Sequence, residues 1–167
     1  MSTVRKPTVL LSSQEYLVRE RAADFRSEYY RGEMFAMAGA RFEHSLIKDH
    51  IAREAGNQLR GGPCQVVTSD LRVKVNVTGL YTYPDLVIVC DEPQFEDAVR
   101  DTLLNPRVIG EVLSESTEKY DRGGKFAHYR QIPWLRYLHS RSSRKPESRA
   151  GGAEPWISPS AAALGWH

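Results

Sequence analysis

Two acidic residues stand inside apolar segments of this sequence, where a carboxylate is costly to place. Asp85 directly follows Pro84 and opens the almost continuous apolar run Asp85–Cys90, and Glu111 lies inside the mostly apolar run Arg107–Leu113. A carboxylate is expensive to bury unless it is paired or binds a metal. Two such residues on neighbouring strands would form a concentrated negative site.

A carboxylate pair of this kind could hold a divalent cation for phosphodiester hydrolysis. Mg²⁺ binds one or two protein carboxylates and keeps waters and substrate phosphate as its other ligands. The cation would polarise a phosphoryl oxygen and activate a water, and a nearby lysine ammonium would neutralise charge in the transition state. A plainer interpretation also exists: Glu111 could pair with a structural Arg or Lys, and Asp85 could be a strand-start or turn residue.

The overall composition fits one ordinary globular domain. The chain has 167 residues, 41% hydrophobic and 26% charged, which is enough to bury a core. No apolar run approaches the roughly 20 residues that span a membrane, and residues 1–11 lack the apolar stretch of a signal peptide. Cys64 and Cys90 lack metal-ligand spacing and cannot form a disulfide framework, so we interpret both as buried apolar residues of strands. By elimination we expect a cytoplasmic protein without a membrane span.

The net charge gives no evidence for nucleic-acid binding. The chain carries +2 overall, and residues 136–167, with five basic and two acidic side chains, carry +3 of it, which leaves −1 on residues 1–135. A basic patch is the usual electrostatic mark of a nucleic-acid-binding domain. An interpretation as a nuclease must therefore rest on the candidate site.

Local patterns predict the elements that would position the two carboxylates. Ser12 and Glu15 have capping-box spacing at the start of a helix. The predicted helices cover Ser13–Ala23, Phe42–Arg60, with a core stripe of Ile47, Ile51, Ala55 and Leu59, and Tyr120–Gln131. The predicted strands cover Ser27–Tyr30, Glu33–Met37, Cys64–Thr68, Leu71–Val77, Asp85–Cys90 and Arg107–Leu113.

The predicted strands differ in their patterns. Leu71–Val77 alternates apolar and polar side chains, as in a half-buried strand, whereas the run at Asp85–Cys90 indicates a central strand covered on both faces. We expect an aromatic loop at Leu80–Pro84 and a polar connection at Asp91–Asn105. The order of elements predicts an α/β fold of the α+β sort, with a central mixed sheet flanked by helices in one domain of residues 11–135.

Several short motifs of this sequence recur together in one known family. They are Glu28-Tyr29-Tyr30-Arg31-Gly32-Glu33, Met37-Ala38-Gly39, His44, Thr68-Ser69-Asp70-Leu71-Arg72-Val73, Tyr83-Pro84-Asp85-Leu86-Val87-Ile88-Val89, Val108-Ile109-Gly110-Glu111-Val112-Leu113-Ser114, Ser116-Thr117, Tyr120-Asp121-Arg122, Lys125 and Tyr129. With them the chain resembles the Uma family of bacterial restriction-endonuclease-like domains, a branch of the PD-(D/E)XK nuclease superfamily. The resemblance covers about Leu11 to Leu135.

The resemblance implies a restriction-endonuclease-like fold and DNA cleavage with Mg²⁺ or Mn²⁺. Asp85 matches the signature Asp and Glu111 the second acid, and both would bind the metal. The usual lysine would lie two residues after the acid, where this chain has Leu113. The signature lysine matches instead Lys125 on the following helix. Lys119, in the connection before that helix, is the less favoured alternative. Relatives in the superfamily often dimerise, so a homodimer is one expectation.

Five further residues have weaker expectations. His44 matches a family position near the site or is a helix residue bonded to a backbone carbonyl. Glu33 could face the metal or merely lie beside the Arg31–Gly32 turn. We expect Asp70 to form a turn, Asp121 to cap the helix of Lys125, and Tyr129, on the same helix face as Lys125, to serve packing.

The C-terminal segment departs from the family. After Arg136 the expected apolar strand is lost at once, and from about Ser140 the sequence is rich in Ser, Arg, Gly and Pro, which is typical of a linker or of disorder. We treat residues 136–167 as an atypical tail, either disordered or the product of a frameshift, so that one or more strands of the sheet would be missing. Two alternatives to a nuclease therefore stay open: an inactive relative that binds nucleic acid or protein, and a non-functional fragment of a mobile or decaying gene.

Overall fold

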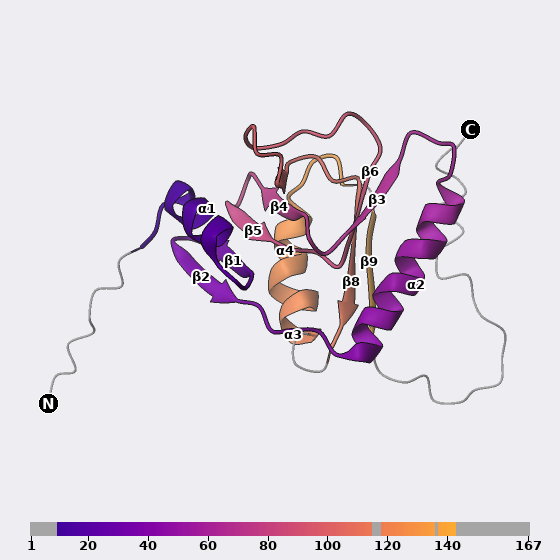
Figure 1. The fold of residues 1–167 in the computed structure, drawn as a ribbon, viewed down its shortest axis with the longest axis horizontal. Helices are drawn as coiled ribbons and strands as arrows, with labels where there is room; N and C mark the ends of the chain where they lie inside the picture. Colours follow the sequence, from indigo (N-terminus) through magenta and orange to yellow (C-terminus); the bar gives the residue numbers. More distant parts are fainter. Residues whose placement is uncertain (1–9, 115–117, 136, 143–167) are drawn as a thin grey trace, which may run out of the picture.

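The strands of the protein form two hydrogen-bonded sheets (Figure 1). The computed structural model describes residues 10–114, 118–135 and 137–142. The five-stranded sheet has the order β2(Glu33–Ala36), β1(Ser27–Tyr30), β5(Leu80–Thr82), β4(Arg72–Val75) and β7(Thr102–Leu103). The four-stranded sheet has the order β3(Gln65–Thr68), β6(Leu86–Val89), β8(Val108–Leu113) and β9(Tyr137–Ser142). Each sheet has one parallel edge pair, β4 with β7 and β8 with β9. The predicted mixed α/β architecture is confirmed.

Helix α1(Ser13–Ala22) packs on the five-stranded sheet. Its capping box is present as predicted, because Ser12 and Glu15 each satisfy a backbone N–H of the other. Tyr16 is fully buried and stacks on Tyr29 of β1, with ring centroids 4.9 Å apart. Tyr81 of β5 completes this aromatic cluster. The helix therefore covers one face of the five-stranded sheet. The predicted hairpin β1–β2 forms one edge of this sheet.

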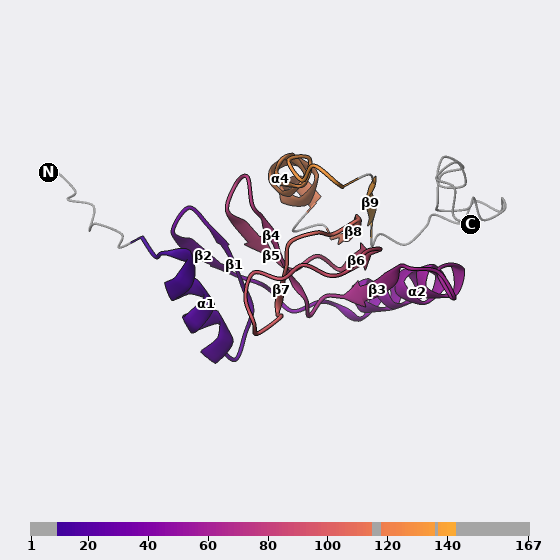
Figure 2. The ribbon, with the colours of Figure 1, turned by 90° about the horizontal axis from the view of Figure 1, so that it is seen from above.

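The four-stranded sheet is covered on both faces. Helix α2(Phe42–Gln58) packs through Ile51 against Leu86 and Val112, while Val87 and Ile109 face the core on the other side, together with Tyr129 of α4(Phe126–Tyr129). Figure 2 shows α2 and α4 on opposite sides of β6 and β8. This double cover explains the almost continuous apolar runs of β6 and β8, which the sequence predicts.

The predicted helix Tyr120–Gln131 is divided into three pieces. It consists of α3(Glu118–Tyr120), a π-helical turn η1(Asp121–Lys125) and α4. A π-turn adds one residue to a helical turn, and such turns are frequent at functional sites. Two predicted connections also contain strands, because β5 lies in the expected loop Leu80–Pro84 and β7 in Asp91–Asn105.

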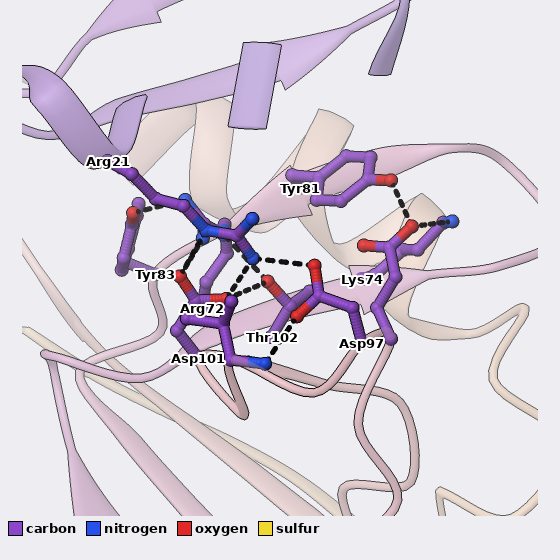
Figure 3. A network of polar contacts seen from close by, with 10 residues as sticks. Arg21, Arg72, Lys74, Tyr81, Tyr83, Asp97, Asp101 and Thr102 are labelled. Atoms are coloured by element: carbon purple, nitrogen blue, oxygen red, sulfur yellow. Dashed lines mark hydrogen bonds and ion pairs between the residues drawn. The ribbon is translucent and has the colours of Figure 1, made fainter. Parts of the chain in front are cut away.

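Strand β4 is more buried than its half-buried pattern predicts, because its polar face is buried at Arg72 and half-buried at Lys74. Arg72, expected on the polar face, is only 2% exposed. Its guanidinium donates to Thr102 Oγ1 at 2.9 Å and to the Tyr83 hydroxyl at 3.0 Å, and it pairs with Asp101 at 2.8 Å. Figure 3 shows this network, in which Arg21 of α1 also bonds to Asp101 and Asp97. These hydrogen bonds and the ion pair offset the cost of burying the arginine charge. An alternation of apolar and polar residues gives no sign that such partners exist.

Cys64 and Cys90 form a disulfide, which corrects their interpretation as unpaired apolar residues. Gln65 and Val89 are partners in the antiparallel β3–β6 ladder, so the two cysteines lie opposite one another just beyond its end. The pairing of β3 with β6 brings the two cysteines, which are 26 positions apart, close enough to bond. Their spacing along the chain does not predict this contact.

The folded unit extends beyond the predicted boundary at residue 135. Tyr137–Ser142 forms β9, which pairs in parallel along the whole of β8. The free hydrogen-bonding groups of β8 offer this segment a partner although its sequence has no apolar alternation. Residues 143–167 lie outside the described residues, so the frameshift hypothesis stays a prediction. In the described part of the chain, none of the helices has the length and apolar character needed to cross a bilayer.

Candidate active site

The pairing of β6 with β8 brings the two predicted carboxylates together. Leu86 and Gly110 are partners in this antiparallel ladder, so Asp85 and Glu111 occupy the next opposed positions. The backbone N–H of Asp85 lies 3.4 Å from Glu111 Oε2. The N-terminal end of α2, the C-terminal end of β8 and α3 converge at the bottom of Figure 1. The site lies where these elements meet.

Asp85 is fixed from two directions. Its Oδ2 accepts a hydrogen bond from the backbone N–H of Val112 at 2.8 Å, and its Oδ1 lies 2.9 Å from Nε2 of His44 on α2. The hydrogen bond with Asp85 raises the pKa of His44 above its ordinary value. Of the two expectations for His44, the structure therefore places it at the site.

Glu111 is almost completely buried. Its Oε1 accepts a hydrogen bond from the Tyr129 hydroxyl at 2.6 Å and lies 3.3 Å from Nζ of Lys125. Burial raises the pKa of Glu111 to about 7, although the Lys125 ammonium opposes this. Tyr129, expected to serve packing only, thus also contacts the carboxylate.

Lys125 is buried among three carboxylates. Its Nζ lies 2.9 Å from Glu28, 3.3 Å from Glu111 and 3.6 Å from Asp121. Burial alone would lower the pKa of Lys125, but these carboxylates raise it well above the ordinary lysine value. The predicted reach of Lys125 from its helix to the sheet is present. Asp121, expected to cap the helix, contacts Lys125 without a capping hydrogen bond.

Glu28 of β1 is a fourth acidic residue of the site and was not expected there from the sequence. Its Oε1 accepts a hydrogen bond from Thr82 at 2.5 Å, and its Oε2 accepts one from the Tyr120 hydroxyl at 3.0 Å. Glu28 stands beside a serine and two tyrosines in β1 and not in an apolar run as Glu111 does, and its partners come from distant segments, so the sequence pattern gives no signal for it. Glu28 is 6% exposed.

Two other candidate residues lie away from this cluster. Glu33 is exposed on β2, and Lys119 is exposed on α3. Within the described ranges neither side chain is bonded to Asp85 or Glu111. Asp70 forms the expected turn after β3 and pairs with Arg26. The structure therefore brings Lys125, rather than its rival, to the acids.

A small cavity opens beside the two carboxylates. It is lined by Lys48, Ile51, Asp85, Leu86, Gly110, Glu111 and Val112. Lys48 lies on the same face of α2 as His44, one turn further along, and was also missed, because a lysine in an amphipathic helix is ordinarily a solvent-exposed residue.

The donors fit a hard divalent cation held by few protein ligands. The described residues contain no group of three or more His, Cys, Asp or Glu that could hold a metal. Asp85 and Glu111 supply two carboxylates, and a cation such as Mg²⁺ takes its remaining ligands from water and phosphate. The two carboxylates thus suit a hard divalent cation that takes its other ligands from outside the protein.

Comparison with known proteins places the chain in a family. The model of the Uma2 family, described as "putative restriction endonuclease", matches residues 13–139. The chain belongs to the Uma2 family. All of the residues described above at the site lie within the matched segment, which ends at residue 139, halfway along β9.

Two relatives of this Uma2 protein are proteins of Synechocystis. The uncharacterized proteins sll1609 and slr1290 of Synechocystis are 34% and 39% identical over 128 and 129 residues. Each alignment covers 77% of this chain, and it covers 72% and 67% of the two relatives.

A solved structure shares the fold. A putative nuclease of the DUF820 family from Anabaena variabilis has a TM-score of 0.56 at 17% identity, covering 69% of this chain and 65% of its own. This Uma2 protein therefore shares its fold with that putative nuclease, and the predicted fold is confirmed.

Proposed function

We propose that this protein is a metal-dependent endonuclease that hydrolyses phosphodiester bonds of DNA. The observation that carries the proposal is the convergence of Asp85, Glu111 and Lys125 from two strands and a helix on one small site. Lys125 and Glu111 are more than 90% buried, and isolated charges are not placed there without cost. The family to which the chain belongs supports nuclease chemistry of this kind.

Each residue has a distinct part in the proposed reaction. Asp85 and Glu111 would hold the divalent cation, which when bound supplies charge neutralisation and polarises the phosphoryl group. Lys125, kept charged by its carboxylate partners, would place a positive charge beside the phosphoryl oxygens as negative charge develops on them. His44 orients the Asp85 carboxylate through the 2.9 Å contact, and Tyr129 orients that of Glu111.

The test is cleavage of plasmid DNA with Mg²⁺ or Mn²⁺ and without metal. We expect nicking only with metal, and a loss of at least about 100-fold for Asp85→Asn, Glu111→Gln and Lys125→Met, as is common when a transition-state contact is removed. Lys119→Met is the matched control, since it removes a lysine charge that is exposed and outside the cluster. Cleavage that survives all three site changes would refute the proposal.

Saturable DNA binding without turnover would favour the inactive relative instead. A cytoplasmic location and a homodimer are included in the proposal as expectations. Fractionation of cells and measurement of the molecular mass in solution test them. Neither expectation is needed for the chemistry of the site.

A further inference from the structure

Lys48 is a second cation at the candidate site, on the side opposite to Lys125. It lines the same cavity as Asp85 and Glu111. It comes from α2, whereas Lys125 comes from the helical segment on the other face of the sheet. The two lysines therefore approach the carboxylates from different sides of the four-stranded sheet.

The two lysines differ in their partners. Lys125 has three carboxylates within 3.6 Å. Lys48 forms no ion pair with any described residue, and its Nζ donates a 2.8 Å hydrogen bond to the neutral Ser69 Oγ. An ammonium group has three donors, so Lys48 has two left for another acceptor. Among the described residues, carboxylates compensate the charge of Lys125 and none pairs with Lys48.

Ser69 connects Lys48 to the main chain of Asp85. The backbone N–H of Ser69 donates to the carbonyl oxygen of Asp85 at 3.2 Å, while its hydroxyl accepts from Lys48. Lys48 is half-buried, so its side chain is directed along the cavity wall and not free in solvent. The position of this ammonium is thus set by the residue that bonds to Asp85.

We propose that Lys48 binds a phosphate of the nucleic-acid substrate and that Ser69 is its positioning residue. The inference rests on the proposed function, because it assigns a residue to hold that enzyme's substrate. A phosphate oxygen is the acceptor that a lysine of this kind most often binds on DNA. It would give Lys48 an anionic partner, which none of the described residues supplies, next to the carboxylates proposed to act on the adjoining bond.

The test is binding of a fluorescent DNA duplex, without metal, over a series of salt concentrations. We expect Lys48→Met to weaken binding about tenfold, as for one charge-assisted contact. It should also reduce the slope of log K against log salt by about 0.9, the loss of one phosphate contact. Lys48→Arg should keep the slope, and Ser69→Ala should weaken binding less than Lys48→Met.

Arg53→Gln is the matched control. It removes one positive charge from an exposed residue of α2 that lies five positions further on, on another face of the helix. If it reduces affinity and slope as much as Lys48→Met does, the effect is one of total charge and the inference is overturned. Circular dichroism and the melting temperature of each variant show whether it is folded.

A cleavage assay in parallel separates this inference from the proposed function. We expect Lys48→Met to raise KM about tenfold with a smaller change in kcat. Wild-type cleavage with binding and KM unchanged in Lys48→Met would overturn the inference and leave the nuclease intact. Binding that depends on Lys48 in a protein that never cleaves would refute the nuclease and support the phosphate site. Absence of any DNA binding by the wild type would overturn the inference.

Discussion

At the scale of residues, the Lys125 ammonium group faces three carboxylates. Lys125 and Glu111 stabilise each other's charge, yet burial still raises the pKa of Glu111 to about 7. A carboxylate in such a place needs each of its partners, because a buried group that loses a hydrogen bond keeps the full cost of its desolvation. The Tyr129 hydroxyl, 2.6 Å from Glu111, is one of these partners.

Removal of this hydroxyl should therefore destabilise the protein. We expect Tyr129→Phe to lower the free energy of unfolding by about 1–3 kcal/mol, measured by urea denaturation. Tyr30→Phe is the control, because the Tyr30 hydroxyl has no hydrogen bond within the described residues although its ring packs on His128. Equal losses in both variants would mean that the bond to Glu111 contributes nothing.

The Arg21–Asp101 pair gives a second prediction, for the dependence of stability on pH. The hydrogen bond with Arg21 holds the pKa of Asp101 well below its usual range. The stabilisation is therefore complete above the ordinary aspartate pKa of about 4 and is lost as the pH falls toward the lower value in the folded protein. The urea midpoint of Asp101→Asn should lie below that of the wild type at pH 7, with a smaller difference at pH 3.

The exposed Asp24 supplies the comparison for Asp101. It forms no ion pair among the described residues, so Asp24→Asn should differ from the wild type by about the same small amount at both pH values. A difference for Asp101→Asn that did not shrink in acid would show that its carboxylate is not the group responsible.

At the scale of elements, the strands were easier to predict than the helical segment of the site. Asp85 and Glu111 could be found because each interrupts a buried apolar strand, and the β6–β8 ladder then places them opposite one another. Glu28 and Lys48 could not be assigned, because their importance depends on contacts between distant segments. The position of Lys125 depends on a π-turn, for which the pattern of apolar residues gives no signal.

The paired glycines of η1 make this turn testable. A Cβ on Gly124 would lie 3.1 Å from the ring of Tyr120, whereas a Cβ on Gly123 would have nothing within 4 Å. Tyr120 holds Glu28, which in turn holds Lys125. Both changes to alanine remove a helical glycine, which favours the helix by up to about 1 kcal/mol.

We expect Gly124→Ala to reduce cleavage several-fold, because the Tyr120 ring must shift, and Gly123→Ala to leave it near the wild-type rate. The measurement is the initial rate of plasmid nicking at saturating metal. If the two variants behave alike, the contact with Tyr120 does not matter for the site.

At the scale of the whole molecule, β9 protects the edge of the sheet that carries Glu111. A chain ending at Leu135 would leave β8 without its parallel partner, and an exposed strand edge favours pairing with other chains. We expect this truncated chain to unfold at lower urea concentration than the full chain and to associate as its concentration rises, as measured by light scattering. A truncated chain that stayed monomeric with an unchanged midpoint would show that β9 is dispensable.

The Lys125 ammonium also links the two sheets through ion pairs. Glu28 belongs to the five-stranded sheet and Glu111 to the four-stranded one, and the same ammonium bonds to both. Buried ion pairs can often be replaced by apolar side chains of similar volume with a gain in stability. Evolution toward a more stable fold and evolution toward a better catalyst would therefore oppose each other at this position. The residues proposed for catalysis would then limit the stability of the fold.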